Sequence, residues 1–398
     1  MSPLVFSDDY TEDEERALFT LSTPARDNST FPSLSVTTGD VQWPVKRIAI
    51  IGAGVGGMTA YRELKRDGFD VHIFERDTLP GGTWHYTEEK PVNAPIPNAP
   101  IAIADFQPSL PPQGVQLPYS TECRDELACT QWRRAHRAPR AIWKSLFTNT
   151  AAPLQQIRGF SWPDGTEWAV PQAKVGRYLR SFASWNGINT NDNSEDISYN
   201  TRVELVEERV ESTGKQVGWT LTTKRMDVAE SGLTKVTWDR QDFDAIVVAS
   251  GQYNSPNIPD IEGLQSWATF SPSNISHSRQ YRHPEEYVGK SVLIVGAAAS
   301  GSQISRDMSP HAASIYQSVR PERNAGDANQ RPTVVDWVRQ LPLNVSVVAE
   351  IKCFLPPNDT IHKSFIQLDS AIPILSYRIT ITKDLDEQAK HPKILYSP

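Results

Sequence analysis

KRIAIIGAGVGGMTAYREL (residues 46–64) combines a short apolar strand, a glycine-rich turn and a helix. Gly52, Gly54 and Gly57 fit the pattern G-x-G-x-x-G. The first glycine permits a tight turn, the second lets the backbone approach a pyrophosphate, and the third lets the helix pack closely on the strand. Because the N-terminus of the helix faces the anion, we count Ala53 with these glycines among the cofactor-binding residues. The stretch predicts a Rossmann-like α/β unit.

The strand that follows this helix indicates which nucleotide the first loop binds. FDVHIFER (residues 69–76) places Glu75 at its end, 18 residues after Gly57. A carboxylate at this position accepts hydrogen bonds from a ribose diol and would repel a 2'-phosphate. The first loop therefore predicts a nucleotide with a free ribose diol, such as FAD. An ordinary glycine-rich turn is the alternative interpretation.

A second strand, turn and helix occur in SVLIVGAAASGSQISRDM, residues 291–308. The turn contains Gly296, Ala298 and Gly301, with Ser300 before the last glycine. Alanine at the middle position narrows the approach of a ligand to the backbone, but it preserves a small turn and a helix start. We therefore predict a second dinucleotide site, formed by these four residues.

The strand after the second helix indicates a different cofactor. It ends at Arg320, 24 residues after Gly296, where the first unit has Glu75. A cation at this position suits the 2'-phosphate of NADPH. A surface arginine without this role is the alternative. The two loops together predict one site for FAD and one for NADPH.

The composition excludes several classes of protein. The formal net charge of -7 argues against a nucleic-acid binder, and the one basic stretch, residues 131–140, is typical of a solvated helix face. No apolar run reaches the roughly 18 residues that a membrane helix needs. Cys123, Cys129 and Cys353 form no disulfide framework and suit a reducing compartment. We expect a cytoplasmic protein with no membrane span and no metal site. The sequence contains no pattern that predicts its oligomeric state.

Several further stretches resemble the flavin-containing monooxygenase family, the class B flavoprotein monooxygenases. PGGTWHY (80–86) is similar to the family's G-G-x-W, and WKSLFTNTAAP (143–153) is similar to its L-x-T-N-x-P. VVASGQYNSPNIPDIEG (247–263) is similar to the family's A-T-G-x-Y-x-x-P linker. ISHSRQYRHP (275–284) is similar to the second half of the fingerprint F-x-G-x-x-x-H-x-x-x-Y. Their order and spacing together are specific, and the resemblance extends from about residue 47 to residue 320.

The resemblance implies roles for individual residues. Gly82, Thr83 and Trp84 would lie beside the phosphates and ring of the flavin. Asn149 would lie at the flavin ring near the nicotinamide, where its amide can donate a hydrogen bond to the peroxide or to the cofactor. We predict that Asn149 is the catalytic residue and that it also binds the cofactor. A turn or capping role is the alternative, because asparagine favours such positions.

The fingerprint departs from the family's pattern in its first half. Counted back from His277, the glycine position falls on Ser273 and the phenylalanine position on Ser271. Phe270 lies one residue out of register, which an insertion of one residue would explain. We interpret His277 and Tyr281 as scaffolding between the two nucleotide-binding domains.

The predicted fold is α/β, with two Rossmann-like domains of the glutathione-reductase and flavin monooxygenase type. The predicted segments are a flexible acidic leader (1–42), an FAD-binding domain (43–258) with a proline-rich insert at about 90–118, an NADPH-binding domain (259–345), and a divergent or truncated return to the FAD domain (346–398). The resemblance implies this return, but the T-G-Y type of turn that ends it is not recognisable.

The resemblance implies an NADPH- and O2-dependent enzyme that oxygenates a soft nucleophile, sulfur or nitrogen, of a small molecule through a flavin hydroperoxide. The leader and the insert suggest specialised metabolism. A Baeyer-Villiger monooxygenase acting on a ketone is one alternative, although its fingerprint usually ends in tryptophan rather than Tyr281. A disulfide reductase using Cys123 and Cys129 is another, although their spacing is wide. A non-catalytic nucleotide-binding relic would follow from a defective C-terminal part.

Overall fold

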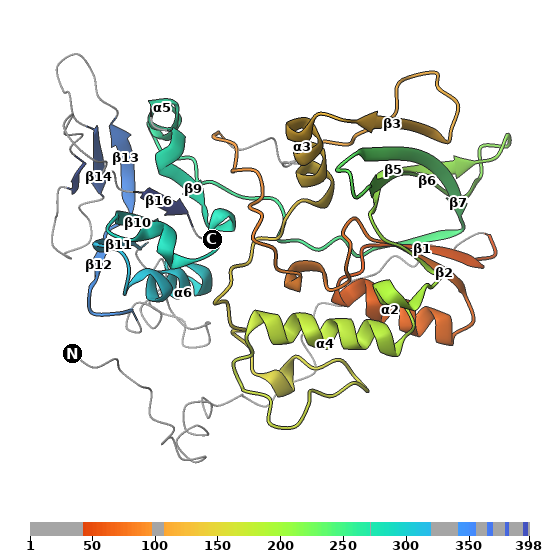
Figure 1. Ribbon diagram of the computed structural model, residues 1–398, viewed down its shortest axis with the longest axis horizontal. Helices are drawn as coiled ribbons and strands as arrows, with labels where there is room; N and C mark the ends of the chain where they lie inside the picture. Colours follow the sequence, from red (N-terminus) through yellow and green to blue (C-terminus); the bar gives the residue numbers. More distant parts are fainter. Residues whose placement is uncertain are drawn as a thin grey trace. The chain divides into compact units, whose positions relative to one another are not determined.

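The computed structural model describes residues 43–97, 107–270, 272–319, 341–355, 364–368, 379–381 and 393–396. The predicted leader lies outside the described residues, as does the middle of the proline-rich insert. The described part is a mixed α/β fold with two parallel sheets and two antiparallel sheets (Figure 1). The predicted α/β class is therefore confirmed.

The first parallel sheet forms around the apolar strand β1. Its order is β4-β2-β1-β8, and every neighbouring pair is parallel. The strands are β1 (Arg47–Ile51), β2 (Asp70–Phe74), β4 (Ile197–Ser198) and β8 (Ala245–Val248), and α2 (Val55–Arg66) crosses from β1 to β2. This is the strand, turn, helix and strand that the glycine pattern predicts.

Both faces of the first sheet are covered. On one face, α2 and α4 (Gln172–Trp185) pack against β1 and β2, with Met58 and Phe182 fully buried. On the other face, Phe74 of β2 packs against Phe243 with ring centroids 5.8 Å apart. That residue belongs to an antiparallel sheet of order β3-β7-β6-β5. Its strands are β3 (Tyr119–Cys123), β5 (Thr201–Val210), β6 (Gln216–Val228) and β7 (Thr234–Phe243).

The second parallel sheet repeats the plan of the first. Its order is β12-β11-β10-β16-β9, and α6 (Ala299–Met308) connects β10 to β11. The strands are β9 (Ile275–His277), β10 (Ser291–Val295), β11 (Ser314–Ser318), β12 (Val345–Val348) and β16 (Lys393–Tyr396). β16 lies parallel to β10, as β8 lies parallel to β1 in the first sheet. Each glycine loop therefore follows a strand that is paired on both sides.

The strands after residue 344 do not extend the first sheet in the part of the chain that the structure describes. β12 and β16 join the second sheet. β13 (Ile351–Leu355), β14 (Ser364–Leu368) and β15 (Ile379–Ile381) form a small antiparallel sheet, which packs on α5 (Leu264–Phe270) through Trp267 and Phe354. The domain limits, including a return of residues 346–398 to the FAD domain, stay predictions.

The described ends of the proline-rich insert are held by the rest of the molecule. The Ser109 N–H donates a hydrogen bond to Glu204 Oε2 at 2.8 Å, and the Trp238 indole N–H donates to the Ser109 carbonyl at 2.6 Å. Near the other end, Ala94 is buried in a cluster with Ile258 and Ile275. Both ends of the insert are thus anchored by specific contacts.

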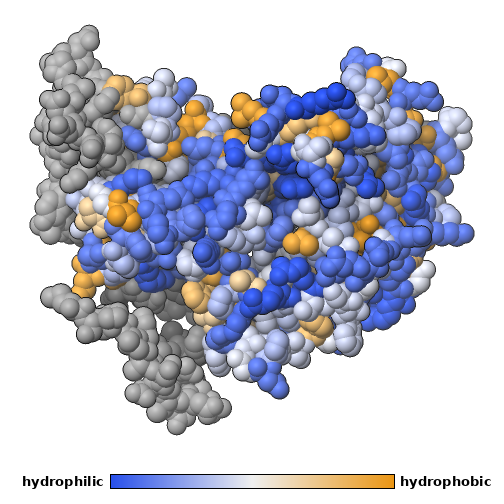
Figure 2. Space-filling view, in the orientation of Figure 1, coloured by the Kyte–Doolittle hydropathy of each residue, from blue (hydrophilic) through white to orange (hydrophobic). Residues whose placement is uncertain are grey.

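The surface of the described part is largely polar on the face drawn in Figure 2. Figure 2 shows a mostly hydrophilic face, on which hydrophobic residues form small separate groups. Such scattered groups are ordinary for the surface of a folded protein. Among the described helices, none is long and apolar enough to cross a membrane.

The basic stretch at residues 131–140 is not simply a solvated face. His136 near the end of α3 (Glu126–Arg137) is fully buried, and its Nε2 donates a hydrogen bond to the Asn200 carbonyl at 3.0 Å. Arg140 just beyond the helix is also buried. The interpretation as a solvated face is therefore wrong for these two residues, because α3 lies against the antiparallel sheet.

The burial of His136 predicts a loss of stability in acid. Burial, followed by the positive charge of Lys224, lowers the pKa of His136 to about 3. Because only the unfolded chain takes up this proton between pH 6.5 and pH 3, stability falls as the pH falls through that window. We expect a loss of about 2 kcal/mol from this group between pH 7 and pH 5.

Urea unfolding at the two pH values measures this loss. The His136→Gln variant serves as the control, since glutamine does not titrate. Its free energy of unfolding should fall less between pH 7 and pH 5 than that of the unmodified chain. Equal falls in both proteins would contradict the assignment of the effect to His136.

Candidate active site

The first glycine loop has the close contacts that its glycines predict. Gly52 has a φ of +106°, and a Cβ there would lie 2.7 Å from the Ala249 carbonyl oxygen. A Cβ on Gly57 would lie 1.9 Å from the Gly52 carbonyl oxygen. Neither position can hold a side chain without movement of the backbone. Glycine is thus required at both positions for the tight turn. The turn leads into α2, whose N-terminus is a suitable site for a pyrophosphate.

The G-G-x-W stretch packs on this loop. The Gly81 N–H donates to the Ala53 carbonyl at 2.9 Å. Gly82 begins the short 3-10 helix η1 (Gly82–Trp84) with a φ of +56°, and a Cβ there would lie 2.9 Å from Gly54 Cα. The structure thus brings together two motifs that the sequence separates by about 30 residues. Because Gly54 and Gly82 have no side chains, the backbone at both positions is accessible to an anionic ligand.

Glu75 lies at the end of β2, where the sequence predicts a ribose acceptor. Its side chain is 3% exposed. Oε2 accepts a hydrogen bond from the Ala53 N–H at 2.7 Å, and Oε1 accepts one from the Asp77 N–H at 2.9 Å. Oε2 has a second lone pair, so the carboxylate retains the capacity to accept a hydrogen bond from a ribose diol.

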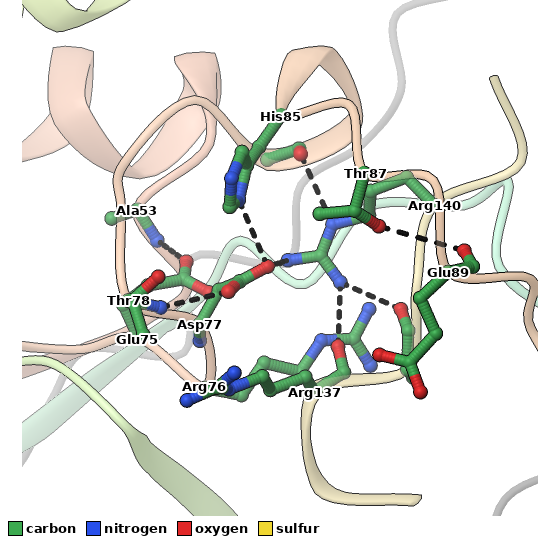
Figure 3. A network of polar contacts seen from close by, with 12 residues as sticks. Ala53, Glu75, Arg76, Asp77, Thr78, His85, Thr87, Glu89, Arg137 and Arg140 are labelled. Atoms are coloured by element: carbon green, nitrogen blue, oxygen red, sulfur yellow. Dashed lines mark hydrogen bonds and ion pairs between the residues drawn. The ribbon is translucent and has the colours of Figure 1, made fainter. Parts of the chain in front are cut away.

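Three polar side chains that the sequence interpretation missed surround Glu75 (Figure 3). Arg140 Nη2 lies 3.5 Å from Glu75 Oε1 and 3.6 Å from Asp77 Oδ2, and His85 Nδ1 lies 3.0 Å from the same Asp77 oxygen. Burial alone would raise the pKa of Asp77, but the hydrogen bond and charge of His85 and the charge of Arg140 lower it to about 2. Asp77 is therefore ionised at neutral pH.

The second loop has the same geometry as the first. Gly296 has a φ of +97°, and a Cβ on Gly301 would lie 2.3 Å from the Gly296 carbonyl oxygen. Ala298 is the N-cap of α6 with φ -72° and ψ -172°, and Gly54 is the N-cap of α2 with φ -75° and ψ -177°. This conformation is allowed for any residue. Alanine therefore fits the middle position of the second loop without backbone strain.

A small cavity of about 110 Å³ lies between η1, the T-N stretch and the start of α6. Trp84 borders it on the side of the first loop, Asn149 comes from the T-N stretch, and Ser300 comes from the start of α6. The remaining lining residues are Trp143, Leu146, Phe147, Thr148, Ala299 and Gln303. The cavity has indole, phenyl and amide groups in its wall and no ionisable side chain among the described residues.

The backbone around Asn149 is fixed, while its side chain is exposed. Buried Thr148 donates its N–H to the Val170 carbonyl at 2.9 Å and accepts the Val170 N–H at 3.0 Å through Oγ1. No hydrogen bond joins the Asn149 amide to another described residue, and the residue is exposed beside the cavity. Within the described part, Asn149 therefore caps no turn, and its predicted role toward a ligand stays a prediction.

The stretch that carries Asn149 is fastened to α6. Asp307 Oδ2 accepts hydrogen bonds from Ser145 Oγ at 2.6 Å and from Tyr281 Oη at 2.5 Å. Burial and the Asp307 carboxylate raise the pKa of Tyr281, so this phenol stays protonated. The contact agrees with a scaffolding role for Tyr281. Sequence reasoning missed Asp307, because nothing in the local pattern of α6 distinguishes it from a surface aspartate.

These contacts predict a measurable loss of stability. The Asp307→Leu variant removes the acceptor from two hydroxyl groups, one of them on the fully buried Tyr281. We expect the free energy of unfolding to fall by roughly 2–3 kcal/mol, because the phenol loses its partner. Urea unfolding should show that the Tyr281→Phe and Asp307→Leu changes together cost less than the sum of their separate effects. Additive losses would show that the pair is not coupled.

The sequence-predicted residues are thus grouped as follows. Gly52, Ala53, Gly54, Gly57, Glu75 and Gly82 lie together around the first loop, whereas Trp84, Asn149 and Ser300 border the cavity next to the second loop. Thr83 is exposed within η1. Arg320 lies outside the described residues, so its predicted contact with a 2'-phosphate stays a prediction.

Comparison with known proteins agrees with this geometry. A family model described as flavin-binding monooxygenase-like matches residues 129–325, and one described as an NAD(P)-binding Rossmann-like domain matches residues 50–110. The flavin-containing monooxygenase iboF of Amanita muscaria is 50% identical over 332 residues, covering 82% of this chain and 62% of that protein. The chain belongs to the flavin-containing monooxygenase family. The expected cofactors, FAD and NADPH, are confirmed for it as a family member.

More distant relatives extend the comparison. The thiol-specific monooxygenase of Saccharomyces cerevisiae is 25% identical over 301 residues, covering 73% of this chain and 55% of that protein. The structure of the S-allyl-L-cysteine S-oxygenase of Allium sativum superposes with a TM-score of 0.56 at 21% identity, covering 88% of this chain and 62% of that one. At this level of identity, the similarity to the Allium sativum structure shows a shared fold. This chain spans between about two-fifths and three-fifths of the length of the curated relatives that it matches.

Proposed function

We propose that this chain catalyses the NADPH- and O2-dependent oxygenation of sulfur or nitrogen in a small molecule. The observation that carries the proposal is the cavity where Trp84, Asn149 and Ser300 meet. It lies between Trp84 of the G-G-x-W stretch, which packs on the first loop, and the start of α6, which suits a nicotinamide nucleotide. A hydride donor and a flavin must come together in such a place.

The residues around the two loops fit FAD and NADPH. The first loop offers a glycine backbone for a pyrophosphate and Glu75 for a ribose, and the second offers the N-terminus of α6. FAD, when bound, supplies the transfer of electrons from NADPH and the activation of O2. The assignment of FAD to the first loop and NADPH to the second is part of the proposal.

The chain's own residues orient the reactants and exclude water. The Asn149 Nδ2–H group can donate a hydrogen bond to the reactive oxygen or to the cofactor. Trp84, Trp143 and Phe147 place apolar surface around the cavity, and such surface protects a water-sensitive reaction. Ser145 and Asp307 hold the Asn149 stretch against α6. No step in this scheme requires an acid or a base among the lining side chains.

The proposed substrate class is a soft nucleophile. The yeast relative is named for its action on thiols, and this supports sulfur as an acceptor. The uncharged cavity wall suits a neutral reacting group. A cytoplasmic location and a place in specialised metabolism stay predictions.

The test uses the whole chain loaded with FAD. NADPH oxidation is followed in air with a panel of thiols, thioethers, amines and ketones, and the products are identified by mass spectrometry. The proposal expects an oxygenated sulfur or nitrogen product. An ester from a ketone would instead establish Baeyer-Villiger chemistry, and a chain that cannot take up FAD would favour the non-catalytic relic.

A further inference from the structure

We propose that Arg140 is a positioning residue that holds Glu75 and the G-G-x-W stretch in register and thereby sets the affinity for the adenosine half of FAD. The inference rests on the proposed assignment of FAD to the first loop. Arg140 lies beyond the end of α3, far in sequence from both partners, and is 7% exposed. It does not belong to either glycine motif.

Backbone carbonyl groups fix the plane of the Arg140 guanidinium. Nε donates to the Gly82 carbonyl at 3.0 Å, and Nη1 donates to the carbonyls of Arg137 and Ala138, each at 3.0 Å. Ala138 adopts a left-handed conformation with φ +44°, which ends α3 and turns the chain toward the site. The guanidinium is therefore pre-organised, so little side-chain entropy opposes its contacts.

The remaining nitrogen of Arg140 faces two buried carboxylates. Nη2 lies between Glu75 and Asp77, whose side chains are 3% and 6% exposed. Two buried negative charges so close together are costly unless a cation compensates them. The need for a compensating cation beside Glu75 and Asp77 is greater because FAD, the proposed ligand, would bring a negatively charged pyrophosphate to the first loop. Arg140 supplies a compensating charge at this point (Figure 3).

The two partners of Arg140 form opposite sides of the proposed FAD site. Glu75 accepts the Ala53 N–H, and Gly82 packs its Cα against Gly54. The Arg140 guanidinium thus contacts both the predicted ribose acceptor, Glu75, and the Gly82 backbone, which packs on the predicted pyrophosphate loop. Arg140 contacts residues that would touch the cofactor, which makes it a positioning residue rather than a catalytic one.

A second buried arginine supports the backbone of the first. Arg282, directly after the fingerprint tyrosine, donates from Nη2 to the Arg140 carbonyl at 3.2 Å and to the Glu89 carbonyl at 2.7 Å. Its Nη1 donates to the Ile142 carbonyl at 3.1 Å. The segment around Arg140 is therefore held on both sides, as expected for a residue with a positional role.

The experiment measures the affinities of the apoprotein for FAD, ADP and FMN by titration calorimetry. In the Arg140→Gln variant, we expect about 10- to 100-fold weaker binding of FAD and ADP. FMN affinity should fall clearly less than FAD affinity, because FMN lacks the adenosine that Glu75 is predicted to hold and keeps only the phosphate and ring beside Gly82. Arg134→Gln on α3 is the matched control, since that partly exposed arginine pairs with Glu89. Its affinities should equal those of the unmodified chain.

A double-mutant cycle separates positioning from general damage to the fold. If Arg140 acts through Glu75, the Arg140→Gln and Glu75→Gln losses of ADP affinity will not multiply in the double variant. Arg140→Lys keeps the charge and folding but lacks the fork of donors, so we expect an intermediate loss. Losses that multiply, or an Arg140→Lys variant with unchanged affinity for FAD and ADP, would overturn the inference. Failure of the unmodified chain to bind FAD would instead overturn the proposed function.

Discussion

Replacement of Asn149 by alanine is expected to leave FAD bound and to lower the rate of product oxygenation by about 100- to 1,000-fold. The Asn149 side chain borders the cavity and bonds to no other described residue, so its removal should not disturb the fold. The loss should come from the missing Nδ2–H donor at the reacting atoms. Product is measured by mass spectrometry, and bound FAD by its absorbance after gel filtration.

A second asparagine provides the control for a turn role. Asn189 does cap a turn, because its Oδ1 accepts the Thr190 N–H at 3.0 Å. The Asn189→Ala change should lower stability by roughly 0.5–2 kcal/mol and leave product formation intact. The opposite pattern is expected for Asn149→Ala. Product formation at the unmodified rate by Asn149→Ala would remove Asn149 from the mechanism.

The Gly301→Ala variant is expected to retain FAD and to bind NADPH more than about 100-fold more weakly. The added Cβ would lie 2.3 Å from the Gly296 carbonyl oxygen, a contact that forces the turn and the start of α6 apart. Because these backbone groups form the second loop, the damage should be confined to that site. NADPH should no longer reduce the bound flavin at low concentration, whereas dithionite should reduce it normally.

The corresponding change in the first loop should have the opposite outcome. A Cβ on Gly57 would lie 1.9 Å from the Gly52 carbonyl oxygen, so Gly57→Ala should lose FAD. Affinity of the apoprotein for the 2'-phosphate fragment 2',5'-ADP should remain, because it belongs to the second loop. Loss of both cofactors in either variant would contradict the assignment of one loop to each.

The local parts of the site could be predicted from the sequence. The spacing of the glycines predicts backbone conformations and contacts within a few residues, and the close contacts at Gly52 and Gly57 agree with that prediction. The same is true of Glu75, which lies where the end of β2 meets the loop. The conformation at Ala298 also explains why the second loop tolerates alanine.

The long-range parts could not be predicted, because they depend on how distant segments pack. Arg140 meets Glu75 across 65 residues, and Ser145 meets Asp307 across 162. A buried arginine and a surface arginine have the same local signature, so the interpretation of residues 131–140 as a solvated face is wrong at Arg140. The place of β16 beside β10 likewise follows from sheet pairing, which the weak pattern of residues 393–396 does not reveal.

The most direct test of the proposed activity is the fate of molecular oxygen. The FAD-loaded chain is incubated with NADPH, ¹⁸O2 and a thioether or an amine that is found to stimulate NADPH oxidation. We predict one ¹⁸O atom on the sulfur or nitrogen of each product molecule, and a rate of labelled-product formation about 100- to 1,000-fold lower when Asn149→Ala replaces the unmodified chain. Oxidation of NADPH that yields only hydrogen peroxide, with no label in the substrate under any condition of the panel, would contradict the proposal.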